Sequence, residues 1–170
     1  VSLLAVPVGG ASVTKFSDVS DSYTATAIET LRLMGVLDGY GDGTFRPDTV
    51  LNRAQFCKMA VYAMDGSGEL GRYSTVTIFP DVKPSHWASA YINMASRKGI
   101  ISGFADGKFK PGQTVTAGQA VTILMRGLGY KDEDMGGVWP QSYMAEAQTN
   151  GLLKSTGITS AYAGVTRAQA

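Results

Sequence analysis

GVLDGYGDGTFRPDTVLNRAQF, at residues 35–56, returns as GIISGFADGKFKPGQTVTAGQA at residues 99–120. The two copies keep one spacing of 64 positions, as three pairs show: Gly35 and Gly99, Pro47 and Pro111, and Gln55 and Gln119. A self-similarity that holds one spacing over a whole stretch indicates a repeat architecture. The sequence therefore predicts a fold that is built from a repeating unit.

A third, shorter copy is predicted from two further matches. WPQSYMAEAQTNGLL from Trp139 aligns with WASAYINMASRKGII from Trp87, and VTRAQA from Val165 aligns with VTAGQA from Val115. This copy lacks the DGTFRP loop. The chain as given stops at Ala170, where the second helix of this copy is expected to begin, so we expect the parent protein to continue.

These matches predict how the chain is divided. The predicted units are residues 16–64, 79–130 and 139–170, with linkers rich in glycine and polar residues at 65–78 and 131–138. The opening stretch, residues 1–15, is apolar and includes several small residues. It is either the remnant of a signal peptide cut after Ala11 or an apolar arm that packs on the domain.

Each unit is predicted to be a helix, a loop and a second helix. The apolar positions at helical spacing are Ala27, Ile28, Leu31 and Met34 in the first helix and Phe56, Met59, Ala60 and Ala63 in the second. Gly35 follows the first helix as its C-terminal cap. One such pair cannot bury its apolar stripe alone, whereas three pairs around a shared axis can. The sequence therefore predicts a mainly α fold, with three helix-loop-helix repeats in a pseudo-threefold prism.

The composition excludes several classes of function. The formal net charge of the 170 residues is +1, so no global field attracts nucleic acid or an anionic membrane. No apolar run approaches the ~20 residues of a membrane span. The single cysteine, Cys57, is expected to be a small buried hydrophobe, and a single histidine, His86, excludes a His-rich zinc site. We expect no cofactor.

The loop of glycines and aspartates is expected to be a connector and not a metal or phosphate site. Asp38, Asp42 and Asp48 lack the alternate spacing and the closing glutamate of a calcium loop. A phosphate loop would need a Lys-Ser or Lys-Thr pair, which is absent here. The glycines suit a tight turn, and Phe45 and its copy Phe109 are predicted to plug the space beneath it.

Two of the three predicted second helices begin with an arginine beside a helix cap. The stretches NRAQ, TAGQ and TRAQ each form a capping box, in which Asn52, Thr116 or Thr166 caps the helix. Arg53 and Arg167 then occupy the first helical position, where the helix dipole opposes a cation. An anion bound against free N–H groups and a guanidinium would explain them. The alternative is a surface arginine that stacks on a neighbour or pairs with a carboxylate.

An aromatic residue recurs at the start of each first helix. Tyr23, Trp87 and Trp139 occupy equivalent positions. Such residues offer a flat apolar face with a polar handle, which suits a sugar ring. They can equally cap the core at the shared axis, and the residues alone leave both interpretations open.

Together these motifs resemble the S-layer homology repeat, whose pattern runs FxDV, HWA, a helix, DGTFRP and then TRAE. FSDVSDSY at residues 16–23 and FPDVKPSHW at residues 79–87 carry its beginning, and the two 22-residue copies quoted first carry the rest. The resemblance implies a secreted, bacterial cell-surface module that anchors proteins non-covalently to the wall. The implied partner is a peptidoglycan-associated secondary cell-wall polysaccharide, often carrying ketal-linked pyruvate.

The resemblance also implies which residues bind. Carried over to this chain, the ligand-binding positions are Arg53, Arg167, Tyr23, Trp87, Trp139, Gly39 and Gly103, with the FxDV aspartates Asp18 and Asp81 in a mainly structural role at the helix entry. The chain departs from the pattern where Ala117 replaces the arginine and where Tyr23 replaces a tryptophan. We therefore expect at most two working grooves.

The sequence is compatible with a structural role as an alternative. The decayed motifs are consistent with a structural module of a surface layer that docks to a partner domain or to itself without binding sugar. Catalysis would have to rest on His86 with the nearby Asp81, and neither paired carboxylates nor a nucleophile motif recur. We expect no enzyme in this segment.

Overall fold

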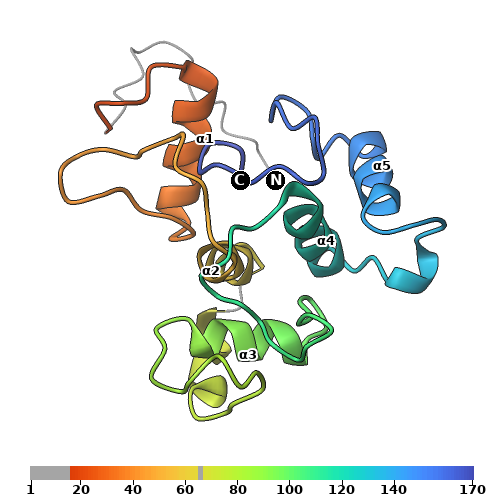
Figure 1. Ribbon diagram of the computed structural model, residues 1–170. Helices are drawn as coiled ribbons and strands as arrows, with labels where there is room; N and C mark the ends of the chain where they lie inside the picture. Colours follow the sequence, from red (N-terminus) through yellow and green to blue (C-terminus); the bar gives the residue numbers. More distant parts are fainter. Residues whose placement is uncertain (1–15, 65–66) are drawn as a thin grey trace, which may run out of the picture.

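The computed structural model describes residues 16–64 and 67–170, and this part of the chain is mainly α-helical, as predicted (Figure 1). The elements in chain order are α1 (Ser22–Leu33), α2 (Arg53–Ala63), the 3-10 helix η1 (Ser67–Tyr73), α3 (Ser89–Arg97), α4 (Ala117–Gly127), the 3-10 helix η2 (Asp132–Asp134) and α5 (Gln141–Thr149). The described residues form three isolated antiparallel β-bridges and no β-strand. The predicted signal-peptide remnant or arm, residues 1–15, lies outside the described residues.

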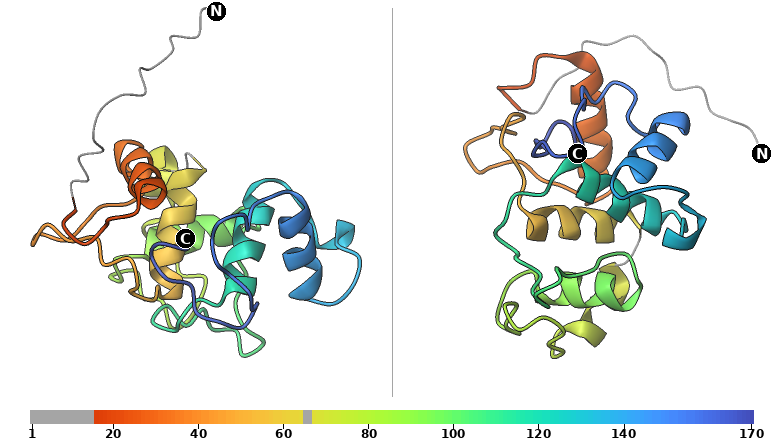
Figure 2. Two further views of the ribbon diagram at one scale, coloured as in Figure 1. Left: turned by 90° about the horizontal axis from the view of Figure 1, so that it is seen from above. Right: turned by 45° about the vertical axis from the view of Figure 1, so that its right-hand side comes forward.

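Three short extended segments meet at the centre of the molecule, two of them ahead of α2 and α4 and the third ahead of a turn at residues 167–169, where the sequence predicted a helix start. The backbone N–H of Leu51 donates to the carbonyl of Val165 (2.9 Å), that of Val165 to Val115 (3.1 Å), and that of Val115 back to Leu51 (3.0 Å). All three side chains are buried. This closed ring of hydrogen bonds joins segments far apart in sequence, and the C-terminal segment accordingly lies centrally in both Figure 1 and Figure 2. The full prism stays a prediction.

The helices pack around this ring in a chain of pairs. Helix α2 packs against α3 and α4, α4 packs against α5, and α3 packs against η1. The left view of Figure 2 shows α1 and α5 on opposite sides of α2 and α4. The main core draws on α2, α3, α4 and the ring, whereas α1 covers a small separate cluster that includes Phe16, Ile28 and Phe45.

The predicted buried face of α1 is only partly correct. Ile28 is buried, but Ala27 is exposed and Met34 is 60% exposed. Helix α1 makes no extensive contact with another helix of the described chain, and its buried residues pack instead against Phe16, Val19 and Phe45. In α2 the prediction holds better, since Phe56 and Ala60 are buried, although Ala63 is exposed.

The segment after α2 is more ordered than a linker. Its 3-10 helix η1 packs on α3, where Glu69 pairs with Lys98 at 2.8 Å. The buried amide of Asn93 donates to the carbonyls of Tyr73 (3.1 Å) and Val76 (2.6 Å). The glycine-rich composition of this stretch therefore did not indicate that η1 forms and packs on α3.

Candidate functional site

A cavity of about 430 Å³ lies between α4, the start of α5 and the loop of residues 101–104. Three of the predicted binding residues line it, namely Arg53, Gly103 and Trp139. They come from the first, second and third predicted units, so no single unit makes this site. The ring of backbone hydrogen bonds brings these three regions of the chain together.

The guanidinium of Arg53 is held rigidly at the wall of the cavity. Its Nε donates to the carbonyl of Phe109 (2.8 Å) and its Nη2 to that of Ser102 (3.3 Å). Its central carbon lies 4.7 Å from the ring centroid of Phe104 and 4.5 Å from that of Phe109. The aromatic rings and the two carbonyls therefore fix the orientation of the charged group.

The charge of Arg53 has no carboxylate partner among the described residues, although the residue is only 5% exposed. Burial lowers the pKa of the guanidinium, yet arginine remains protonated at neutral pH. Within the described part of the chain its Nη1 has no acceptor, and this nitrogen is not fully buried. An unpaired charge that lines a cavity is suited to binding an anion.

The backbone N–H groups at the start of α2 are not free to bind an anion. The N–H of Arg53 donates to the carbonyl of Gln113 (2.9 Å) and that of Ala54 to Pro111 (3.1 Å). The next N–H is capped by Asn52 within the predicted capping box. The expectation of free N–H groups at this helix start is therefore wrong, because the second copy of the loop occupies them. Anion binding falls to the side chain.

Trp139 provides an apolar face at the cavity. The residue is 51% exposed, and its indole Nε1 donates to the hydroxyl of Thr122 (3.0 Å). This bond fixes the ring while leaving much of its surface in water. Gln119 and Ser142 add polar side chains to the same lining. A flat apolar ring beside hydrogen-bonding groups is an arrangement that suits a sugar.

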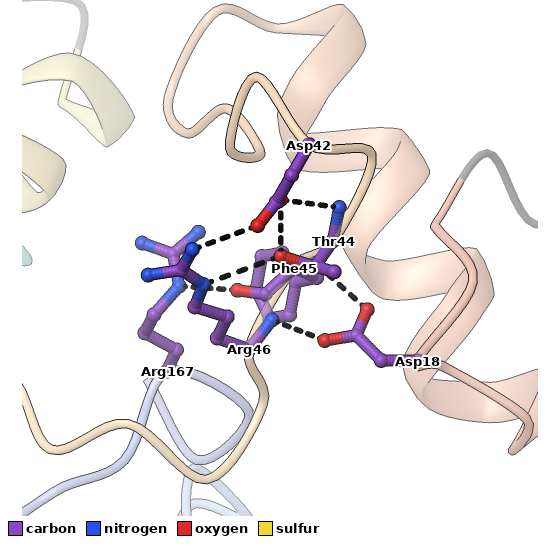
Figure 3. Close-up of polar contacts among 6 residues, drawn as sticks. All are labelled: Asp18, Asp42, Thr44, Phe45, Arg46 and Arg167. Atoms are coloured by element: carbon purple, nitrogen blue, oxygen red, sulfur yellow. Dashed lines mark hydrogen bonds and ion pairs between the residues drawn. The ribbon is translucent and has the colours of Figure 1, made fainter.

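Arg167 repeats the geometry of Arg53 on the first loop. Its Nε donates to the carbonyl of Phe45 and its Nη2 to that of Asp38, both at 2.8 Å. Its central carbon lies 5.2 Å from the Tyr40 ring centroid. Figure 3 shows Arg167 and Asp18 approaching this loop from opposite sides. The structure thus places each arginine on the loop of a different unit from its own.

The remaining predicted aromatics lie outside the cavity. Tyr23 is 67% exposed at the start of α1, and Trp87 is 56% exposed and stacks on His86 with ring centroids 5.7 Å apart. Neither residue lines the cavity, nor does Arg167 or Gly39. Their assignment to ligand binding stays a prediction.

The FxDV aspartates hold the loops and not the helix entry. Asp18 accepts the N–H groups of Phe45 and Arg46, both at 2.7 Å. Asp81 accepts those of Phe109 (2.9 Å) and Lys110 (2.7 Å) in the same way. The entry to α1 is capped instead by Asp21, whose carboxylate accepts the N–H of Thr24 at 2.6 Å. The structural role predicted for the FxDV aspartates therefore acts on the loop.

These aspartates predict a loss of stability in acid. Backbone hydrogen bonds, chiefly that from Phe45, hold the pKa of Asp18 below its ordinary 3.8. The pKa of Asp81 is also lowered, since its backbone bonds outweigh the opposing effect of burial. A depressed folded pKa gives stability that is complete above the unfolded value and is lost as pH falls through the folded one. We expect the melting temperature to be level from pH 7 to 5 and to drop below pH 3.8. A level melting temperature down to pH 2 in calorimetry would contradict this.

Gly39 and Gly103 have a packing role that the sequence did not indicate. A Cβ built on Gly39 would lie 1.9 Å from Cε1 of Phe16. One on Gly103 would lie 2.6 Å from Cε1 of Phe79 and 2.9 Å from the carbonyl oxygen of Lys108. Each glycine therefore lets the phenylalanine of the FxDV motif pack directly on the loop.

Replacing Gly103 with alanine is expected to destabilise the domain by about 2 kcal/mol, because the added methyl group overpacks this contact. Chemical denaturation followed by circular dichroism measures the change. Gly112→Ala is the matched control, since a Cβ there meets nothing within 4 Å. Equal effects of the two substitutions would refute the packing explanation.

The chain belongs to the S-layer homology domain family, which matches residues 15–57 and 78–121. It is 37% identical over 164 residues to a cell surface protein of Thermoanaerobacter kivui, a match that covers 95% of this chain and 21% of the relative. It is 33% identical to the middle cell wall protein of Brevibacillus brevis over 79% of this chain and 13% of that protein. A cellulosome-anchoring protein of Acetivibrio thermocellus is 32% identical over 66% of this chain and 26% of its own length.

These comparisons support a location at the bacterial cell surface. The chain spans about a quarter or less of the length of the relatives named above. Within the part that the structure describes, no helix is long and apolar enough to span a membrane, and no cluster of three potential metal ligands occurs.

Proposed function

We propose that this segment anchors its parent protein non-covalently to the cell wall by binding an acidic secondary cell-wall polysaccharide in the Arg53 cavity. The observation that carries the proposal is the buried guanidinium of Arg53, which has no carboxylate partner in the described chain and lines a cavity beside Trp139. A carboxylate on the polymer, such as ketal-linked pyruvate, would supply the missing negative charge.

The rest of the cavity supports a carbohydrate ligand. The exposed ring of Trp139 offers a stacking surface, and Gln119 and Ser142 offer donors and acceptors for hydroxyl groups. A related protein is named for anchoring the cellulosome, which supports an anchoring role for this segment. We include residues 139–170 in the module as a third, degenerate unit, because Trp139 lines the cavity and Val165 completes the central ring.

A second candidate function rests on the exposed face of α1. Leu33 is 75% exposed and Met34 60% exposed, and no other helix of the described chain covers them extensively. Such a face is consistent with a structural module that docks to a partner domain or to itself without sugar. This alternative predicts self-association and indifference to the polysaccharide.

The deciding experiment is co-sedimentation of the purified segment with cell-wall sacculi. We expect binding to intact sacculi, loss of binding after extraction of the secondary polymer, and weakened binding after removal of its pyruvate alone. Binding to sacculi that have lost the polymer would refute the proposal. Self-association in sedimentation velocity, without any binding to sacculi, would favour the second candidate.

A further inference from the structure

The cavity holds a second cation that the sequence did not single out. Its charged lining residues are Arg53, Arg126 and Asp132. Arg126 extends from α4, and Asp132 lies in η2, within the stretch that the sequence indicated to be a linker. We propose that Asp132 sets the charge selectivity of the cavity, which favours a singly charged acidic sugar, such as one carrying a carboxylate, over a sugar phosphate monoester. This inference rests on the proposed function.

Asp132 neutralises the charge of Arg126 through a bidentate salt bridge. The Nε of Arg126 donates to Oδ1 of Asp132 at 2.8 Å, and its Nη2 donates to Oδ2 at 2.6 Å. The hydroxyl of Tyr143 donates to the same Oδ1. The hydrogen bond from Arg126 is the main reason that the pKa of Asp132 is lowered, so the carboxylate stays ionised at neutral pH. Arg126 therefore adds no net charge to the cavity.

The carboxylate remains able to act on a ligand. The side chain of Arg126 is 17% exposed, whereas that of Asp132 is 64% exposed. The negative end of the pair is thus the one that faces water. A ligand carrying a second negative charge would be repelled by Asp132, and the described residues that line the cavity offer it no free cation besides Arg53.

Helices α2 and α3 are the repeat of α4 and α5, and they carry a contact without a salt bridge at the equivalent positions. Tyr62 in α2 and Tyr91 in α3 occupy the positions that correspond to Arg126 in α4 and Tyr143 in α5. Their hydroxyl oxygens lie 3.4 Å apart. Burial raises the pKa of the Tyr91 hydroxyl to about 12, so this hydroxyl is neutral at pH 7. A contact without net charge therefore joins the helices in both copies.

The net charge of Arg53, Arg126 and Asp132 in the cavity is +1, and this indicates the charge of the ligand. Arg53 alone matches one carboxylate. A phosphate monoester carries roughly −1.5 to −2 at neutral pH, which exceeds the single free charge of the cavity. The carboxylated sugar is therefore the better match for the cavity as it stands.

The test compares three oligosaccharides of the same length and linkage by isothermal titration calorimetry. One contains a uronic acid, one a sugar 6-phosphate, and one is neutral. We expect the wild-type segment to prefer the uronic acid. Asp132→Asn, which frees the charge of Arg126, is expected to strengthen binding of the phosphate by about tenfold and to reverse the preference. Asp134→Asn, an equal charge change at an exposed residue outside the cavity lining, should change neither affinity.

Arg126→Met makes the opposite change and tests the proposal a second time. It leaves the charge of Asp132 without a cationic partner, although Tyr143 still donates to this carboxylate, so binding of the uronic acid is expected to weaken by about tenfold. Combining Arg126→Met with Asp132→Asn should restore the wild-type preference. Unchanged affinities in both single variants would overturn the selectivity proposal, whereas loss of uronic acid binding in Arg53→Met would still uphold the proposed function. If Arg53→Met binds all probes normally, the proposed function itself is wrong.

Discussion

Arg53→Met is expected to abolish retention of the segment on cell walls while its helical circular dichroism persists. The substitution keeps the hydrophobic stem and removes the charge that faces the cavity. Charge-assisted hydrogen bonds to a carboxylate contribute about 1.5–3 kcal/mol each. We therefore expect the affinity for the polymer to fall about a hundredfold, measured by co-sedimentation over a range of sacculi concentrations.

Two further variants separate the loss of this particular charge from general effects of the substitution on the protein. Arg53→Lys retains the charge but loses the planar fork, so it should bind with intermediate affinity. Arg97→Met makes the same chemical change on an exposed surface and should bind like the wild type. If Arg53→Met retains binding and Arg167→Met loses it, the ligand binds at the first loop shown in Figure 3 and not at the Arg53 cavity.

Asp81→Asn is expected to give a large loss of stability for an isosteric change. The carboxylate accepts N–H groups from Phe109 and Lys110, and Lys110 is held at a φ of 58°. An amide offers only one acceptor oxygen, so one of the two loop N–H groups loses its partner. We expect the free energy of unfolding to fall by about 2 kcal/mol and the melting temperature by roughly 4–8 °C.

The same variant should also weaken binding, because the loop that Asp81 holds carries the carbonyl of Phe109 that orients Arg53. Asp48→Asn is the matched control, since Asp48 is exposed and its side chain makes no hydrogen bond or ion pair within the described residues. A normal melting temperature in Asp81→Asn would show that the loop holds its shape without this carboxylate.

Local sequence patterns predicted the starts of α2 and α4, whereas the helix expected after Thr166 is a turn at residues 167–169. The capping boxes at Asn52 and Thr116 form as predicted, because a cap involves residues only three positions apart. Phe45 and Phe109 are 1% and 0% exposed, as expected of plugs beneath their loops. The exposed part of α1 was harder to predict, because helical spacing gives the apolar face but not whether a neighbour covers it.

The sequence by itself thus determined the repeat, the helix caps, the loop plugs and the arginines to examine. Only the tertiary structure decided which loop each arginine meets: Arg53 binds a carbonyl 56 positions away, and Arg167 one 122 positions away. It also brought Asp132, within an apparent linker, onto Arg126. Caps and turns depend on neighbours in the chain, whereas the charge of the cavity depends on the ring that joins Leu51, Val115 and Val165. No local pattern encodes how that ring closes.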